Sequence, residues 1–322
     1  MDGLLELAVL PSFSSIGPHL RRRIWGWSDP RPGALEGRTV LVTGATGGLG
    51  RATARAMAGL GARVILVGRD PGRLAALRAE LAGEADPARF AVHVADMADL
   101  ASVRALAGAI SASESAIDLV VDNAGAIFPE RAAAADGTEA SMALMLLGPF
   151  RLVAGLIPLL ERASDARVVA VSSGGMYAQP LDVDDLDGAR LEYSGARFYA
   201  RAKRAQVGIV REWARRMRES SITFVAMHPG WARTPGLSAS LPGFDRYMGP
   251  ILRTPEEGID TITWLATAPR DDLQPGALYL DRRPRPFDRV PWTRVTATER
   301  RRLWDEVVRR VGIPDPAPAM PR

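Results

Sequence analysis

The chain has 322 residues and a mass of 34.6 kDa, enough for one large α/β domain or two small ones. Hydrophobic residues make up 47% of it, which argues against wholesale disorder, and the absence of cysteine excludes disulfides and thiolate metal sites. The 41 Lys and Arg residues face 37 Asp and Glu residues, and all but one of the 41 are arginine, the exception being Lys203.

The basic residues do not indicate a nucleic-acid-binding protein. The formal net charge is only +4, and the arginine clusters at 21–23 and 300–302 belong to no nucleic-acid-binding motif, so we expect solvated faces there. The three histidines have no metal-ligand spacing, which predicts no metal site.

The N-terminal extension, residues 1–36, is apolar and then basic, the reverse order of a secretory signal. No uninterrupted apolar run in the chain reaches the ~18 residues expected of a membrane span. The apolar residues of this extension either pack on the main domain, which we favour, or contact a membrane surface as a peripheral segment. With no cysteine in the chain, we expect a cytoplasmic location.

From residue 37 to residue 282 the chain alternates runs rich in Val, Ile and Ala with helical stretches, a pattern typical of parallel βαβ units. Because these runs are nearly continuous rather than alternating, both faces of the sheet should be covered. We therefore expect one doubly wound α/β domain with a parallel sheet of about seven strands. The expected strands are residues 38–44, 63–68, 90–96, 118–125, 166–173, 221–230 and 276–280.

The C-terminal extension, residues 283–322, contains a predicted docking helix. The sequence TATE at 296–299 is a capping box that begins a helix, and Gly312 fits its end. One face of this helix carries an apolar stripe, which we expect to pack on the main domain. The stripe consists of Trp304, Val307, Val308 and Val311.

A glycine-rich turn, TGATGGLG at 43–50, lies between the first strand and the first helix. Glycine is required where a turn takes positive φ or where the backbone approaches a pyrophosphate closely. The N-terminus of the following helix offers unpaired N–H groups to phosphates. A strand before the turn and a helix after it therefore predict a Rossmann-type nucleotide-binding site.

The spacing TGxxxGxG of Gly44, Gly48 and Gly50 resembles the short-chain dehydrogenase/reductase family, over roughly residues 37–282. The resemblance implies a nicotinamide cofactor, held by these glycines with Leu49 and Arg51.

The end of the second strand addresses the choice of cofactor. Gly68 stands where members of this family that prefer NAD carry an aspartate, and Arg69 follows. A guanidinium can pair with a 2′-phosphate that a carboxylate would repel, so we expect NADP(H) to be preferred over NAD(H). Solvated arginines are the alternative, and Asp70 weakens the distinction.

The resemblance implies further cofactor contacts at the ends of later strands. Asp96 matches the residue that contacts the adenine ring, although it could instead cap the next helix. The family's NAG and PGxxxT motifs supply the other implied contacts. These are Asn123, Ala124, Gly125, Pro229, Gly230 and Thr234.

Tyr199 and Lys203 lie four residues apart and therefore on one face of a helix. They form the YxxxK motif of the family, in which the tyrosine exchanges a proton with the substrate and the lysine binds the nicotinamide ribose. An ammonium beside a phenol, whose unperturbed pKa is ~10, should lower that pKa. The family pattern assigns to Ser173 a hydrogen bond with the substrate carbonyl. The predicted catalytic residues are thus Ser173, Tyr199 and Lys203.

One position departs from the family. Many members carry an asparagine before the fifth strand that holds a proton-relay water, and alignment of residues 136–150 puts Met145 there. Asn123 is the one asparagine in the chain, so no realignment restores it. Ser141 or a backbone-bound water could take over the relay. The alternative is a catalytically weakened NADP-binding sensor or scaffold.

Residues 167–283 resemble the retinol-dehydrogenase-like branch of the family, which implies a small lipophilic carbonyl or alcohol as substrate and no nucleic acid. The loop that follows Thr234 is apolar enough to cover such a substrate. Its apolar residues are Leu237, Leu241, Phe244 and Tyr247.

Overall fold

A computed structural model describes residues 9–234 and 242–317. Eight strands form one sheet, and their bounds are β1 Thr39–Thr43, β2 Arg63–Gly68, β3 Phe90–Val94, β4 Leu119–Asp122, β5 Ala166–Val171, β6 Ile222–Met227, β7 Leu278–Leu280 and β8 Arg283–Arg285. Their order in the sheet is β3-β2-β1-β4-β5-β6-β7-β8, parallel except for β8. The doubly wound α/β fold is confirmed, with eight strands in the described part of the chain.

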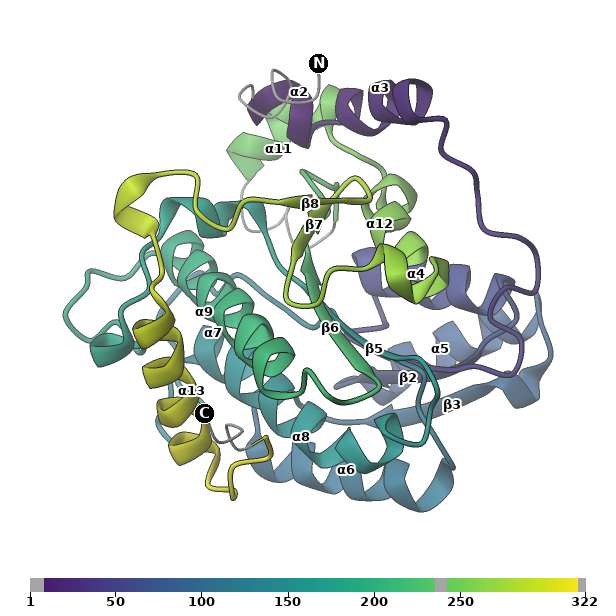
Figure 1. Ribbon diagram of the computed structural model, residues 1–322, viewed down its shortest axis with the longest axis horizontal. Helices are drawn as coiled ribbons and strands as arrows, with labels where there is room; N and C mark the ends of the chain where they lie inside the picture. Colours follow the sequence, from purple (N-terminus) through teal and green to yellow (C-terminus); the bar gives the residue numbers. More distant parts are fainter. Residues whose placement is uncertain (1–8, 235–241, 318–322) are drawn as a thin grey trace.

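Helices cover both faces of the sheet (Figure 1). One face packs against α4 (Gly48–Gly59), α5 (Pro71–Ala82) and α12 (Pro255–Thr267), and the other against α6 (Leu100–Ser113), α8 (Gly148–Leu160) and α9 (Gly195–Arg216). Each face has its own apolar core. The order of the strands reverses between β1 and β4, and this reversal places the crevice of a doubly wound sheet at their carboxyl ends.

Strand β8 was not expected, because Pro284 makes its sequence unlike that of a strand. Proline is tolerated there since β8 is the edge of the sheet and pairs antiparallel to β7 alone. The turn between the two strands places Asp281 and Arg282 at φ of 53° and 58°. The C-terminal extension therefore begins by continuing the sheet.

The helix that begins at the capping box is α13, Ala297–Val311, with Thr296 as N-cap and Gly312 as a left-handed C-cap. Its apolar stripe packs beside α9, where Trp304 is fully buried. The ring of Trp304 lies edge-on to Trp213 of α9, with 4.7 Å between the centroids. This contact joins the C-terminal helix to the core.

One helical segment is apolar on average, although Arg151 interrupts its apolar run. Residues Ala140–Leu160 form a continuous helical stretch of 21 residues with an 18-residue window of mean hydropathy 2.0, long and apolar enough to cross a membrane by length and composition. It comprises α7 (Ala140–Met142), the π-helical turn η2 (Ala143–Leu147) and α8. Because 72% of that window is buried inside the fold, we assign the stretch to the core.

The described part of the N-terminal extension packs on the main domain. It contains α2 (Val9–Phe13) and α3 (Ile16–Trp25), with Phe13 and Arg21 buried. Arg21 forms an ion pair with Asp281, to which Arg253 also binds at 2.6 Å. The solvent-facing side of the two helices is mixed, with exposed apolar residues beside His19, Arg22 and Arg23. It exposes Leu10, Ile16, Leu20 and Ile24.

Candidate active site

The glycine-rich turn after β1 meets the NAG segment after β4 at the reversal of the strand order. Thr43 joins them, because its hydroxyl accepts hydrogen bonds from the backbone N–H groups of Asn123 and Ala124, each at 3.0 Å. The Asn123 amide donates back to the carbonyl of Thr43 at 2.9 Å. Sequence analysis had not assigned Thr43, although it directly precedes the first glycine of the motif.

The turn is shaped so that only backbone lines it. Gly44 and Gly48 take φ of 64° and 50°, and a Cβ on Gly50 would lie 2.2 Å from the carbonyl oxygen of Gly44. Helix α4 begins at Gly48, and its N-cap, Gly47, has no side chain to satisfy the first N–H groups. A close-fitting backbone cradle with unpaired N–H donors suits the pyrophosphate of a dinucleotide.

Two predicted residues of this turn point to other neighbours. The side chain of Leu49 packs against Gly258 of α12, where an added Cβ would lie 2.7 Å from the Leu49 Cδ2. Arg51 forms an ion pair with Glu80 of α5, and this hydrogen bond raises the pKa of the guanidinium. Arg51 is therefore engaged with a carboxylate rather than directed into the turn.

Arginines do approach the turn from the end of β2. Arg69 is exposed and makes no hydrogen bond or ion pair within residues 9–234 and 242–317. Arg73, four residues later in α5, donates from Nη2 to the carbonyl of Thr46 at 3.0 Å and so lies across the turn. The carboxylate of Asp70 caps α5 by accepting from the Arg73 N–H. Arg73 was not among the predicted site residues, although its position one helical turn after Arg69 could have indicated it.

Asp96, predicted to contact adenine, is exposed just beyond β3. Its Oδ1 accepts a hydrogen bond from the N–H of Ala98 at 2.9 Å. The N-cap of the next helix, α6, is Asp99. Asp96 therefore stabilises its own turn at the carboxyl edge of the sheet and leaves the capping of α6 to Asp99.

Helix α9 brings Tyr199 and Lys203 onto one face, with the ammonium 5.8 Å from the centroid of the tyrosine ring. Ser173, which follows β5, is hydrogen-bonded to the Tyr199 side chain. Burial raises the pKa of Tyr199, and the bond with Ser173 only partly opposes it. The lysine was expected to lower this pKa, but in the structure burial outweighs any effect of the ammonium and the net shift is upward.

Lys203 is 2% exposed and its Nζ donates to the carbonyl of Val171 at 2.6 Å and to Oε1 of Gln206 at 3.2 Å. The Gln206 amide in turn donates to Oδ2 of Asp122 at 2.6 Å. Burial lowers the pKa of Lys203 to about 8, and the Asp122 carboxylate opposes this effect. Neither Asp122 nor Gln206 was singled out in the sequence, though Asp122 directly precedes the lone asparagine.

Met145 lies in the π-helical turn η2 and is fully buried in the apolar core. A Cβ added at Gly125 would lie 3.2 Å from the Sδ of Met145 and 3.7 Å from the Nζ of Lys203. A thioether has no proton to donate. The hydroxyl of Ser141 donates to Glu139 at 3.0 Å. These two side chains therefore offer Lys203 no proton relay.

The loop after β6 lies against the N-terminal extension. Gly230 takes φ of 71°, and the N–H of Trp231 donates to the carbonyl of Phe13 at 2.7 Å. The Phe13 ring also packs on Gly174, where an added Cβ would lie 2.5 Å from the ring. Phe13 thus contacts Gly174, the residue that directly follows Ser173. Its place could not be read from the sequence, because it is a contact between segments far apart in the chain.

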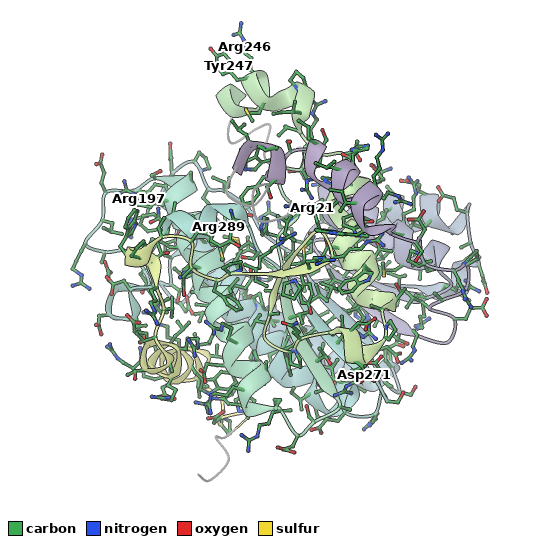
Figure 2. All side chains as sticks on the ribbon, turned by 45° about the horizontal axis from the view of Figure 1, so that its top comes forward. Arg21, Arg197, Arg246, Tyr247, Asp271 and Arg289 are labelled. Carbon is green, nitrogen blue, oxygen red and sulfur yellow. The ribbon has the colours of Figure 1, made fainter. Side chains whose placement is uncertain are left out.

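The remaining predicted residues of this region lie in the loop after β6, in α11 or outside the described residues. Pro229 and Thr234 flank the loop after β6, whereas Leu237 and Leu241 lie outside the described residues. Phe244 belongs to α11 (Pro242–Met248), and Tyr247 at its end is 82% exposed and points away from the body of the molecule (Figure 2). Tyr247 does not cover the site in this structure.

His228, at the end of β6, is fully buried and accepts a hydrogen bond from the N–H of Gly230 at 3.3 Å. Burial, together with nearby arginines, lowers its pKa well below the ordinary value, so the ring is neutral. Over residues 9–234 and 242–317 no group of three or more His, Asp or Glu side chains is arranged to hold a metal ion.

Comparison with known proteins yields clear relatives. A family model described as "short chain dehydrogenase" matches residues 38–242. Dehydrogenase/reductase SDR family member 12 of Bos taurus is 39% identical over 253 residues, which cover 78% of this chain and 79% of that protein. A candidate daunorubicin C-13 ketoreductase, DnrU, of Streptomyces sp. (strain C5) is 40% identical over 281 residues, or 87% and 94% of the two chains. Retinol dehydrogenase 13 of Homo sapiens is 30% identical over 324 residues, or 98% and 96%.

Proposed function

Because the chain belongs to the short-chain dehydrogenase/reductase family, we propose that it interconverts a carbonyl and an alcohol on a lipophilic substrate and prefers NADP(H) to NAD(H). The family resemblance of the motifs is confirmed, and the chain is an oxidoreductase acting on CH–OH groups with a nicotinamide cofactor. The observation that carries the proposed carbonyl chemistry is the grouping of Ser173, Tyr199 and Lys203.

The proposed chemistry divides between cofactor and protein. The bound nicotinamide supplies or accepts the hydride. Ser173 donates a hydrogen bond to the carbonyl oxygen, whose negative charge develops in the transition state. Tyr199 donates a proton to that oxygen in reduction and removes it in oxidation. Since burial raises the pKa of Tyr199, the hydroxyl is protonated at neutral pH and is ready to act as the acid.

The proposed preference for NADP(H) rests on Arg69 and Arg73. Both lie at the carboxyl edge of the sheet next to the turn, and Arg69 has no partner within the described residues. Asp70 does not offset them, because its carboxylate is used as the N-cap of α5. A 2′-phosphate would give the two guanidinium groups a charge-assisted partner.

The proposed substrate class follows from the relatives. The name of the human relative assigns it retinol, and that of the Streptomyces relative the C-13 ketone of daunorubicin. Next to Gly174, which follows Ser173, the buried ring of Phe13 packs edge-on to Trp231, with 5.7 Å between ring centroids. Aromatic side chains close to a polar catalytic group are compatible with a lipophilic carbonyl compound.

The test of the proposed reaction is consumption of NADPH with a panel of ketones and aldehydes that includes retinal, steroid ketones and polycyclic aromatic ketones. Tyr199→Phe should reduce turnover by about 10²–10⁴-fold and leave NADPH binding intact. Tyr193→Phe is the matched control, because Tyr193 donates to the carbonyl of Phe128 and not to the site. Turnover retained in Tyr199→Phe would refute the assignment.

The cofactor preference is tested separately by titration with NADPH and NADH. Arg73→Ala and Arg69→Ala should each weaken NADPH binding by about 10- to 150-fold, since a charge-assisted hydrogen bond contributes about 1.5–3 kcal/mol, and should leave NADH binding unchanged. Arg55→Ala removes an exposed arginine that pairs with Glu84 at 2.8 Å and serves as the control. Equal losses for both cofactors would contradict the proposal.

A second candidate function is an NADP-binding sensor or scaffold with weak turnover. The observation that favours it is Met145, which occupies the position of the relay asparagine without a polar group. On this alternative NADPH binds, no carbonyl compound of the panel is reduced, and Tyr199→Phe changes nothing measurable.

We propose a cytoplasmic location, with membrane contact as the alternative that the exposed apolar residues of α3 support. The control variant replaces Ile16, Leu20 and Ile24 by serine and keeps the buried Arg21 that holds the segment in place. Cell fractionation and liposome flotation of both forms decide between the two. Membrane binding that the serine variant loses would overturn the cytoplasmic assignment.

A further inference from the structure

A buried carboxylate lies behind the catalytic lysine. Asp122 is the last residue of β4 and is 4% exposed. Its Oδ2 accepts the hydrogen bond from Gln206, whereas its Oδ1 has no hydrogen-bond partner within the described residues. A buried carboxylate that is only half satisfied carries a large desolvation cost. The mechanism proposed above makes no use of it.

Gln206 connects this carboxylate to Lys203. The two side chains leave α9 three residues apart, on one face of the helix. The Gln206 amide oxygen accepts from Nζ at 3.2 Å and its nitrogen donates to Asp122 at 2.6 Å. The opposite orientation would set the amide N–H groups against the ammonium and the amide oxygen against the carboxylate. The charges at its two ends therefore fix the amide in one orientation.

We propose that Asp122, acting through Gln206, is a positioning residue that keeps Lys203 protonated and aimed at the active site. The proposal rests on the oxidoreductase function proposed above. Of the three N–H groups of the ammonium, one is bonded to the carbonyl of Val171 and one to Gln206. The third is left for the cofactor ribose and Tyr199.

The electrostatics of the pair define a pH window. Burial raises the pKa of Asp122 to about 6, and Lys203 and Gln206 oppose it. Burial lowers the pKa of Lys203 to about 8, and Asp122 opposes it. Within the described elements, Lys203 is the one charged group that shifts the pKa of Asp122, and Asp122 is the one charged group that shifts the pKa of Lys203. The remaining titratable neighbour on α9 is Tyr199. Both groups are charged between about pH 6 and 8, and loss of the carboxylate would lower the pKa of Lys203 further.

Since Lys203 is the one lysine of the chain, its protonation can be measured directly. Protein labelled with [ε-¹³C]lysine gives a single side-chain NMR signal, which is titrated with NADPH absent and present. Asp122→Asn keeps the shape and removes the charge. The expected result is a proton affinity of Lys203 lower by about tenfold or more, the effect of an opposite charge nearby. The alkaline limb of the kcat–pH profile should move to lower pH by the same amount.

The matched control is Asp118→Asn, which removes a carboxylate four residues earlier, where Asp118 binds Arg38 at 2.7 Å. It should leave the lysine signal and the profile unchanged. The double variant Asp122→Asn with Gln206→Glu returns a carboxylate, now in contact with Nζ, and should restore both. Rescue of this kind would not follow from a merely structural role of Asp122.

An unchanged titration of Lys203 in folded, NADPH-binding Asp122→Asn would overturn the proposal. If that variant does not fold, Gln206→Met tests the same link, because loss of the acceptor should also lower the proton affinity of the ammonium, and an unchanged titration there would overturn it equally. The NMR measurement needs no substrate. If the titration of Lys203 shifts as expected in Asp122→Asn while the wild-type protein reduces no carbonyl compound, the proposed function is refuted and the link between Asp122 and Lys203 is supported.

Discussion

Replacing Lys203 by arginine separates the charge at this position from its shape. The side chain is 2% exposed, and its Nζ lies 2.6 Å from the Val171 carbonyl and 3.7 Å from the position of a Cβ on Gly125. The planar guanidinium is larger, so it must displace these neighbours, and overpacking costs about 1–3 kcal/mol. For a domain of this size the melting temperature should fall by roughly 2–4 °C per kcal/mol. Turnover should fall by about 10²–10⁴-fold, because the ammonium can no longer support Tyr199.

The assay compares kcat, KM, NADPH binding and melting temperature in wild type, Lys203→Arg and Lys203→Met. Methionine has nearly the length of lysine and no charge, so this variant should lose turnover, and its melting temperature should fall because the buried Asp122 carboxylate loses its opposite charge. Arginine keeps that charge, so a lower melting temperature in Lys203→Arg reports overpacking alone. If Lys203→Arg retained turnover within about threefold and melted like the wild type, the reasoning that only a compact ammonium fits this pocket would be refuted.

Three further changes test other parts of the structure. Gly50→Ala places a Cβ 2.2 Å from the carbonyl of Gly44, and the resulting displacement of the turn should weaken NADPH binding by about 10²-fold in a fluorescence titration. Asp281→Asn keeps a residue type that tolerates positive φ but removes the buried carboxylate that Arg21 and Arg253 share, which should cost about 3–5 kcal/mol in denaturant unfolding. Trp304→Ala empties a fully buried site between α13 and α9 and should cost about 3–5 kcal/mol in the same measurement; a loss below 1 kcal/mol would mean that α13 contributes little to the core.

The strands could be located from the sequence because a strand covered on both faces needs an uninterrupted apolar run. Their ends were less accurate: residues 118–125 were expected as one strand, whereas β4 ends at Asp122. The residues beyond it, Asn123 to Gly125, leave the sheet and line the site. Strand β8 was missed because its proline has no N–H for a ladder, which only an edge strand tolerates.

The site could be predicted where the motif residues are close in sequence or end neighbouring strands. Tyr199 and Lys203 share a face of α9 by helical spacing alone. The contacts of Phe13 with Gly174 and of Arg73 with Thr46 join segments that no local pattern connects. The sign of the Tyr199 pKa shift was beyond the sequence for a similar reason, since it depends on how deeply the hydroxyl is buried.

Two features of this chain meet at Lys203. On one side Met145 replaces a side chain that could hold a relay water, and its thioether offers neither a strong acceptor nor a donor. On the other side Asp122 and Gln206 form a hydrogen-bonded path that ends in a charge. A buried ammonium facing only apolar groups would lose its proton near neutral pH. The carboxylate opposes that loss, so an enzyme without the relay asparagine can still present a charged lysine to Tyr199 and the cofactor.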